Sequence, residues 1–75
     1  MKIRDIFAIN LRHARRAANL SQEELAHRAD LDRTYISALE RAVYAATIDV
    51  VERLAIALEV EPADLLVRPR RSRTN

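Results

Sequence analysis

The chain has 75 residues, contains neither cysteine nor glycine, and carries a formal charge of +2. This length fits one small domain, and the missing cysteines exclude disulfides and thiolate metal sites. A glycine-rich phosphate loop is excluded as well, and tight hairpins are disfavoured, so we expect an all-α fold. There is no apolar run of membrane-spanning length and no signal-peptide pattern. We therefore expect a cytoplasmic protein that does not contact a membrane.

The charges are unevenly distributed along the chain. Residues 1–47 hold 8 basic and 6 acidic residues, whereas residues 48–67 hold 1 and 5. The last segment, RPRRSRTN, is rich in arginine and has no aliphatic or aromatic side chain. We expect residues 1–67 to form the domain and residues 68–75 to be a disordered basic tail. An anionic partner such as DNA should contact the N-terminal half of the domain.

The N-terminal segment predicts an amphipathic helix over roughly residues 2–18. Its apolar positions recur at helical spacing, namely Ile3, Phe7, Leu11, Ala14 and Ala18. Asn19 follows, and asparagine is the second choice after glycine for the left-handed geometry that ends many helices.

Residues 21–41, SQEELAHRADLDRTYISALER, predict two short helices joined by a tight turn, the geometry of a helix-turn-helix motif. Ser21 and Glu24 have the spacing of a capping box, and Asp32 can cap the second helix. Asp30 occupies a turn position that needs positive φ, which aspartate tolerates. On spacing alone, an ordinary helical hairpin with a solvated polar face is an equal alternative.

The C-terminal half predicts two further helices after an apolar loop. Residues 42–46, AVYAA, offer no glycine or asparagine, so Ala42 either takes a strained positive φ or the helix ends differently. This loop packs either on its own domain or against another subunit. Thr47 is expected to cap a helix from Ile48 to about Leu58, with Ile48 pointing inward, and Pro62 to open a fifth helix.

Several motifs together resemble the Xre/Cro-type helix-turn-helix family, which includes the lambda and 434 phage repressors. They are LRHARRAANLSQEELA, YISALER, TIDVVERLAIALEV and PADLL, and the resemblance covers about residues 6–67. The stretch LDRTYISALER is similar to restriction–modification controller proteins, which are small homodimeric regulators. The resemblance implies a compact, five-helix, lambda-repressor-like domain that binds double-stranded DNA and regulates transcription. Ala42 departs from the family pattern, which usually has glycine or asparagine there.

The outer face of the second motif helix supplies the residues expected to read DNA bases. Arg33 can bridge guanine O6 and N7, Thr34 can meet a thymine methyl or a polar base edge, and Ala38 can touch a thymine methyl. Arg33 making only a phosphate contact is the alternative. The resemblance places Gln22 on a phosphate, and the other expected backbone contacts are Arg15, Tyr35, Ser37, Arg41 and Tyr44. Tyr35 packing inside the domain is left open, as are Arg41 and Tyr44 being merely exposed.

The resemblance also implies an ion pair between Arg15 and Glu40, which sequence spacing cannot show. A single recognition helix contacts few base pairs, so we expect a homodimer on a palindromic operator with half-sites about 10–10.5 bp apart. The expected interface lies in the C-terminal part, and the candidates are Val43, Val60, Leu65 and Val67. The alternative is that these four residues belong to the core of the monomer.

We predict a sequence-specific transcriptional regulator that acts by occupying its operator, with RNA polymerase as a further partner if it activates. One alternative is an antitoxin-type protein that binds DNA and a protein partner. The other is a non-specific nucleic-acid binder that relies on the arginine-rich tail. His13 and His27 are isolated, and no catalytic or metal-binding pattern accompanies them, so we expect no enzyme activity, cofactor or metal.

Overall fold

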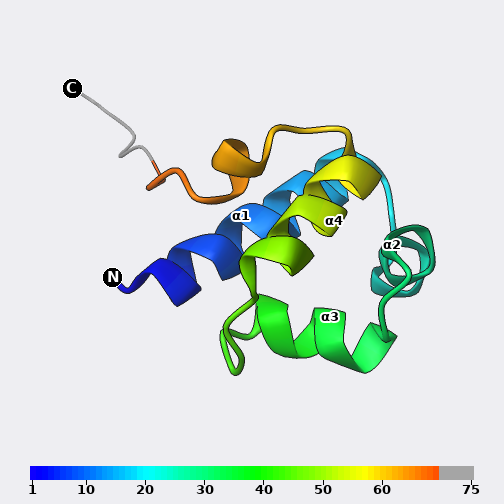
Figure 1. The fold of residues 1–75 in the computed structure, drawn as a ribbon, viewed down its shortest axis with the longest axis horizontal. Helices are drawn as coiled ribbons and strands as arrows, with labels where there is room; N and C mark the ends of the chain where they lie inside the picture. Colours follow the sequence, from blue (N-terminus) through cyan, green and yellow to red (C-terminus); the bar gives the residue numbers. More distant parts are fainter. Residues whose placement is uncertain (70–75) are drawn as a thin grey trace.

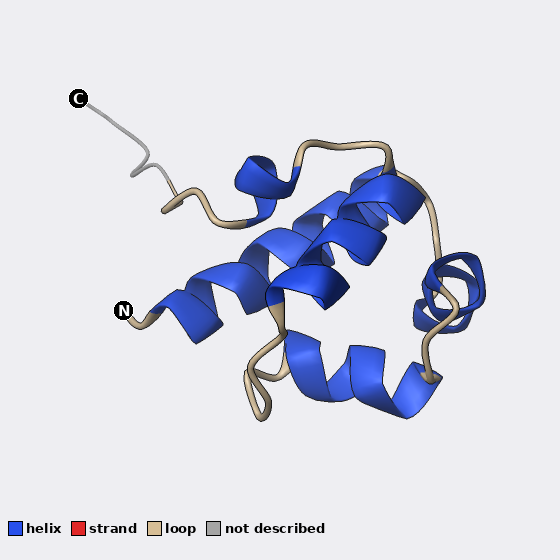
Figure 2. Ribbon diagram, in the orientation of Figure 1, coloured by secondary structure: helices blue, strands red, loops and turns tan. Residues whose placement is uncertain are grey.

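The computed structural model describes residues 1–69, which form four α-helices and one 3-10 helix. In chain order these elements are α1 (Ile3–Ala17), α2 (Gln22–Ala29), α3 (Arg33–Glu40), α4 (Ile48–Leu58) and the 3-10 helix η1 (Pro62–Leu65). The described part contains no strand (Figure 2). The predicted all-α class is confirmed, and the expected fifth helix is the short 3-10 helix η1. Most of the predicted basic tail, residues 70–75, lies outside the described residues.

The helices form a small bundle in which α3 lies at the periphery (Figure 1). α2 packs against both α3 and α4, α1 packs against α3, and η1 folds back onto α1 and α4. Asn10 on α1 holds η1 in place, because its Nδ2 donates to the carbonyl oxygens of Leu65 and Val67 at 3.1 and 2.7 Å. This arrangement leaves one face of α3 open to solvent.

Three of these helices begin at the capping residues that the sequence predicts. Ser21, Asp32 and Thr47 each accept a hydrogen bond from a backbone N–H two or three residues further on, at 3.0 to 3.1 Å. Each bond satisfies one of the backbone donors that the first helical turn leaves without an intrahelical partner.

The four described α-helices end in the same backbone motif, although the chain has no glycine. The residues with positive φ, between 57° and 60°, are Asn19, Asp30, Ala42 and Glu59. An apolar residue follows each one. The backbone N–H of this apolar residue donates a hydrogen bond to the carbonyl oxygen of the residue five positions earlier, at 2.8 to 3.1 Å. This is the Schellman motif, which pairs carbonyl groups that the helix end leaves free. The predictions for Asn19 and Asp30 are confirmed, and Ala42 takes the positive φ that was one of its two alternatives. The left-handed conformation of Glu59 was not predicted.

The core draws on every described helix. Its fully buried large side chains are Ile6, Leu11, Leu25, Ile36, Leu39, Leu54 and Leu65. The prediction that Ile48 points inward is wrong, because its side chain is 86% exposed. Ile48 instead lines a surface groove together with Pro62 and Leu66. Within the described residues, the helices are too short or too polar to span a bilayer.

Candidate nucleic-acid interface

Reciprocal hydrogen bonds fix the N-terminal end of α2. The Glu24 N–H donates to Ser21 Oγ at 3.0 Å, and the Ser21 N–H donates to Glu24 Oε1 at 2.7 Å. The backbone bond from Ser21 is the main reason that the pKa of Glu24 is lowered from its ordinary value. These bonds fix the backbone at the N-terminal end of α2. The helix dipole and the free N–H groups at this end favour contact with an anion.

The exposed face of α3 carries most of the side chains expected to reach DNA. Arg33 and Thr34 are exposed at its first turn, and Arg41 is exposed just after its end. Ser37 is half-buried between these ends, and Arg41 Nε lies 3.4 Å from its Oγ. The expectation that Ala38 touches a thymine methyl is wrong, because this residue is only 3% exposed. The face that remains is polar and cationic, as groove recognition requires.

Glu40, at the end of α3, is a buried carboxylate with several donors around it. Arg15 Nε lies 2.6 Å from Oε2, and Arg15 Nη2 lies 3.0 Å from Oε1. Gln22 Nε2 donates to Oε1 as well, at 3.1 Å. The Glu40 carboxylate thus joins α1, the start of α2 and the end of α3, and the ion pair implied by the family resemblance is present.

Arg15 has little capacity left for a phosphate. Its Nη1 donates to the carbonyl of Leu20 at 2.9 Å, and its side chain is largely buried. The hydrogen bond to Glu40 is the main reason that the pKa of Arg15 is raised, so the guanidinium stays charged. Its position therefore favours the structural role over contact with the DNA backbone.

Arg12 makes a contact with the end of α3 that the sequence did not predict. Its Nη2 donates to the main-chain carbonyl of Glu40 at 2.9 Å, at the C-terminal end of α3. A cation in that place is favoured by the negative end of the helix dipole. The two residues are 28 positions apart in the chain, so no local pattern signals the contact.

Tyr35 and Tyr44, both expected to contact the DNA backbone, also pack against each other. Their ring centroids are 6.4 Å apart with tilted planes, and Tyr35 also packs against the core. Tyr35 therefore packs partly inside the domain, the alternative left open by the sequence. Tyr44 is exposed in the loop after α3.

Comparison with known proteins agrees with this geometry. The model of the helix-turn-helix family matches residues 11–65. The chain belongs to this helix-turn-helix family. Control protein C.BamHI of Bacillus amyloliquefaciens is 45% identical over 65 residues, covering 85% of this chain and 80% of that protein.

Two solved structures are also similar. The hypothetical transcription factor NHTF from Neisseria gives a TM-score of 0.88 at 41% identity, covering 91% of this chain and 78% of that one. The restriction-modification controller protein C.AhdI from Aeromonas hydrophila gives 0.80 at 39% identity, covering 83% and 94%. Xre-type helix-turn-helix proteins of this kind are DNA-binding transcription regulators, and this chain is one of them.

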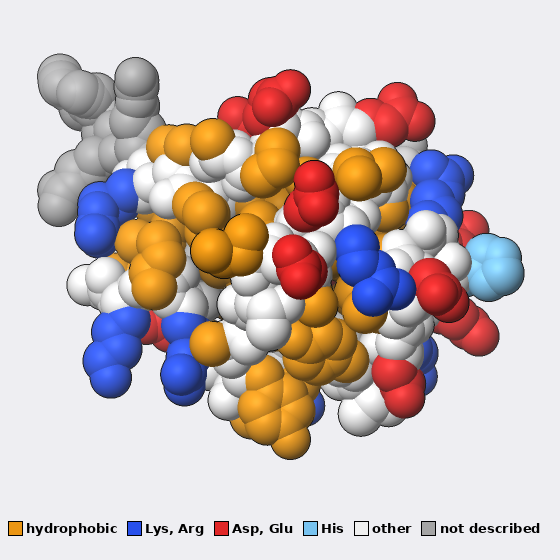
Figure 3. Space-filling view, viewed as in Figure 1, with side chains coloured by type: hydrophobic (Ala, Val, Ile, Leu, Met, Phe, Trp, Pro, Cys, Tyr) orange, Lys and Arg blue, Asp and Glu red, His pale blue; other side chains and the backbone are white. Residues whose placement is uncertain are grey.

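The helix-turn-helix domain has a second notable surface, which is apolar. Its exposed side chains gather around the start of α4 and η1, on the face seen in Figure 3. The large exposed ones that line the hollows there are Ile3, Ile48 and Leu66. We call these three residues the apolar face.

The interface candidates from the sequence divide into two groups. Val43 and Val67 are exposed, whereas Val60 is half-buried against the core. Leu65 is 1% exposed and fully part of the core, which is the alternative that the sequence left open for it. Ile48, the most exposed apolar side chain there, was missed because its spacing matches the buried face of α4.

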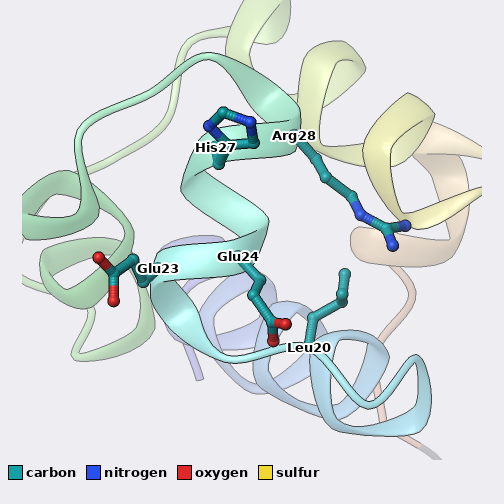
Figure 4. Close-up of a pocket in the computed structure, with 5 residues that line it drawn as sticks. All are labelled: Leu20, Glu23, Glu24, His27 and Arg28. Atoms are coloured by element: carbon teal, nitrogen blue, oxygen red, sulfur yellow. The ribbon is translucent and has the colours of Figure 1, made fainter.

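A hollow beside α2 offers no converging set of reactive groups. It is lined by Leu20, Glu23, Glu24, His27 and Arg28. Figure 4 shows that the Glu23 carboxylate and the Arg28 guanidinium point to opposite sides of α2, and that Arg28 points away from α3. Most of the side chains expected to contact DNA lie instead on α3 and at the start of α2.

Proposed function

We propose that this protein is a sequence-specific regulator that binds a palindromic operator as a homodimer and acts by occupying it. The observation that carries the proposal is the first turn of α3. Arg33 and Thr34 are both exposed there, on a helix whose other end is fixed by the buried Glu40 centre. A rigid helix that presents a forked cation and a hydroxyl at its N-terminal turn is suited to base readout in the major groove.

In this proposal, Arg33 reads a guanine and Thr34 reads a neighbouring base edge. Gln22, Ser37, Arg41 and Tyr44 contact phosphates on either side. Gln22 uses one amide hydrogen for Glu40 and retains a second donor. Its link to Glu40 would hold that donor in a fixed direction beside the N-terminal end of α2.

We further propose that a second copy of the chain covers the apolar face. Ile48 and Leu66 of this face line a groove beside η1 and lie in the acidic half of the sequence, which DNA repels. A two-fold axis there would present two α3 helices to half-sites about one helical turn apart. Val43 and Val67 remain interface candidates, and Ile48 and Leu66 join them.

The similarity to C.BamHI and C.AhdI supports a specific regulatory role, control of a restriction–modification system. A controller can repress by excluding RNA polymerase from a promoter or activate by contacting polymerase from an upstream site. The genes beside the coding sequence test this role, because a controller requires a methyltransferase and an endonuclease under the operator that it binds.

The DNA-binding proposal is tested by selecting operators from a random duplex library at physiological salt. Wild type, Arg33→Ala and Arg28→Ala are selected in parallel, and the last is a charge-matched control whose side chain points away from α3. We expect wild type and Arg28→Ala to enrich one palindrome, and Arg33→Ala to lose preference at one guanine per half-site. Binding without any enriched sequence, abolished by truncation after Val67, would favour non-specific binding through the tail.

The dimer is tested by sedimentation of wild type and Ile48→Glu over micromolar concentrations. We expect wild type to sediment as a dimer and Ile48→Glu as a folded monomer with unchanged circular dichroism. A concentration-independent monomer would contradict the dimer. In that case, capture of a different protein through the same face would support the antitoxin-type alternative.

A further inference from the structure

Arg53 on α4 makes bonds that the DNA-binding roles above do not use. Its Nε and Nη2 donate to the main-chain carbonyl of Ala29 at 3.2 and 3.0 Å, and Nη2 also donates to the carbonyl of Asp30 at 2.6 Å. Arg53 Nη2 also lies 3.6 Å from Oδ2 of the fully exposed Asp30 carboxylate. An exposed charge pair of this kind is weak, so the bonds to the two carbonyls are the stronger part of the contact. The Arg53 guanidinium therefore binds mainly the backbone of the turn between α2 and α3.

The turn that Arg53 holds has few other restraints. The Schellman bonds from Leu31 and Asp30 pair with the carbonyls of Ala26 and His27, at 2.8 and 3.2 Å. These bonds do not involve the carbonyls of Ala29 and Asp30, which belong to the peptide groups just before and just after the Asp30 Cα. Arg53 binds both of them and places a cation at the negative end of α2.

The turn is short, so its backbone angles determine where α3 points. Only residues 30–32 separate α2 from α3. A small rotation at Asp30 therefore moves Arg33, the first residue of α3, relative to Gln22 at the start of α2. A planar guanidinium with donors in a fixed fork resists such a rotation, whereas a lysine ammonium is a single point on a flexible stem.

We propose that Arg53 is a positioning residue for DNA recognition, which sets the direction of α3 by clamping the α2–α3 turn to α4. Arg53 does not need to touch DNA for this role. The inference rests on the proposed function, since it assumes that Arg33 and Thr34 read bases. It adds a link between the helix that carries part of the apolar face and the helix that reads DNA.

The proposal is tested with Arg53→Met, Arg53→Lys and two controls. Arg28→Met removes an exposed cation from α2, and Asp30→Asn removes the exposed carboxylate but keeps both carbonyl acceptors. For each variant, affinity is measured for the selected operator and for a scrambled duplex, well below the midpoint of thermal unfolding. The ratio of the two affinities corrects for the lost charge, because phosphate attraction contributes to both.

We expect Arg53→Met to reduce the ratio of specific to non-specific affinity about tenfold, the size of one lost base contact. Arg53→Lys should fall between Arg53→Met and wild type, and both controls should keep the wild-type ratio. An unchanged ratio in folded Arg53→Met would overturn the positioning role. An equal loss in Asp30→Asn would also overturn it, because the charge pair and not the backbone clamp would then be responsible.

A structural measurement keeps this inference separate from the proposed function. If wild type selects no operator, the proposed function fails, and the clamp is then judged by residual dipolar couplings of α2 and α3 in free wild type and Arg53→Met. A change in the angle between these helices supports the clamp. An unchanged angle, with unchanged exchange of the Leu31 amide, refutes it.

Discussion

Replacing Ala42 by glycine should stabilise the protein, although alanine is the better helix former. Ala42 has φ 60° at the end of α3, where an L-residue other than glycine is strained by about 1–2 kcal/mol. Glycine removes this strain but makes the unfolded chain more flexible, which costs about 0.4–1 kcal/mol. The net gain is then about 1 kcal/mol, or about 4–8 °C in melting temperature for a domain of this size.

The matched control for this prediction is Ala45→Gly. Ala45 lies in the same loop, is exposed, and does not have positive φ. Glycine there adds only unfolded-state flexibility, so it should destabilise the protein by about 0.4–1 kcal/mol. Thermal unfolding is followed by circular dichroism at one fixed protein concentration, because a dimer melts at a concentration-dependent temperature. A drop in melting temperature for Ala42→Gly, equal to that of Ala45→Gly, would refute the strain argument.

Three further predictions concern the hydrogen bonds of the fold. Because the pKa of Glu24 is lowered in the folded state, its charge stabilises the fold above the ordinary value of 4.5, and this contribution is lost as the pH falls through the folded pKa. The melting temperatures of wild type and Glu24→Gln should therefore converge on acidification, and a pH-independent difference would exclude this linkage. Arg15→Ala should cost about 3 kcal/mol in urea unfolding, because it leaves the Glu40 carboxylate buried without its main partner, and the double variant with Glu40→Leu should recover part of that loss. Asn10→Ala removes two bonds to carbonyls at the end of η1, so it should cost about 1–2 kcal/mol in the same assay.

The positions of functional residues around Glu40 depend on contacts between distant parts of the chain. Arg12 and Arg15 come from α1, Gln22 comes from α2, and all three donate to Glu40 or its carbonyl. Arg53 reaches the turn from 23 positions away. No sequence motif marks either contact: Arg12 is one of several arginines on α1, and Arg53 is the single arginine of α4, far in the chain from the turn that it binds.

Local interactions explain what the sequence by itself determined. Ser21, Asp32 and Thr47 cap helices through bonds to backbone groups two or three residues away, so the printed residues suffice to locate these helix starts. Asn19 and Asp30 tolerate left-handed geometry by their own chemistry, which makes the helix ends predictable in the same way. The exposed pair at the start of α3, on which the functional proposal rests, also followed from helical spacing.

Only the tertiary structure decided which side chains remain accessible once the helices pack. Spacing placed Ala38 on the outer face of α3 and Ile48 in the core, and the structure reverses both of these assignments. Helical periodicity gives the direction of a side chain relative to its own axis, but burial also depends on where the neighbouring helices end and at what angle they cross. The contacts of Arg53 with the α2–α3 turn exist for the same reason, because packing of α4 against α2 brings them together.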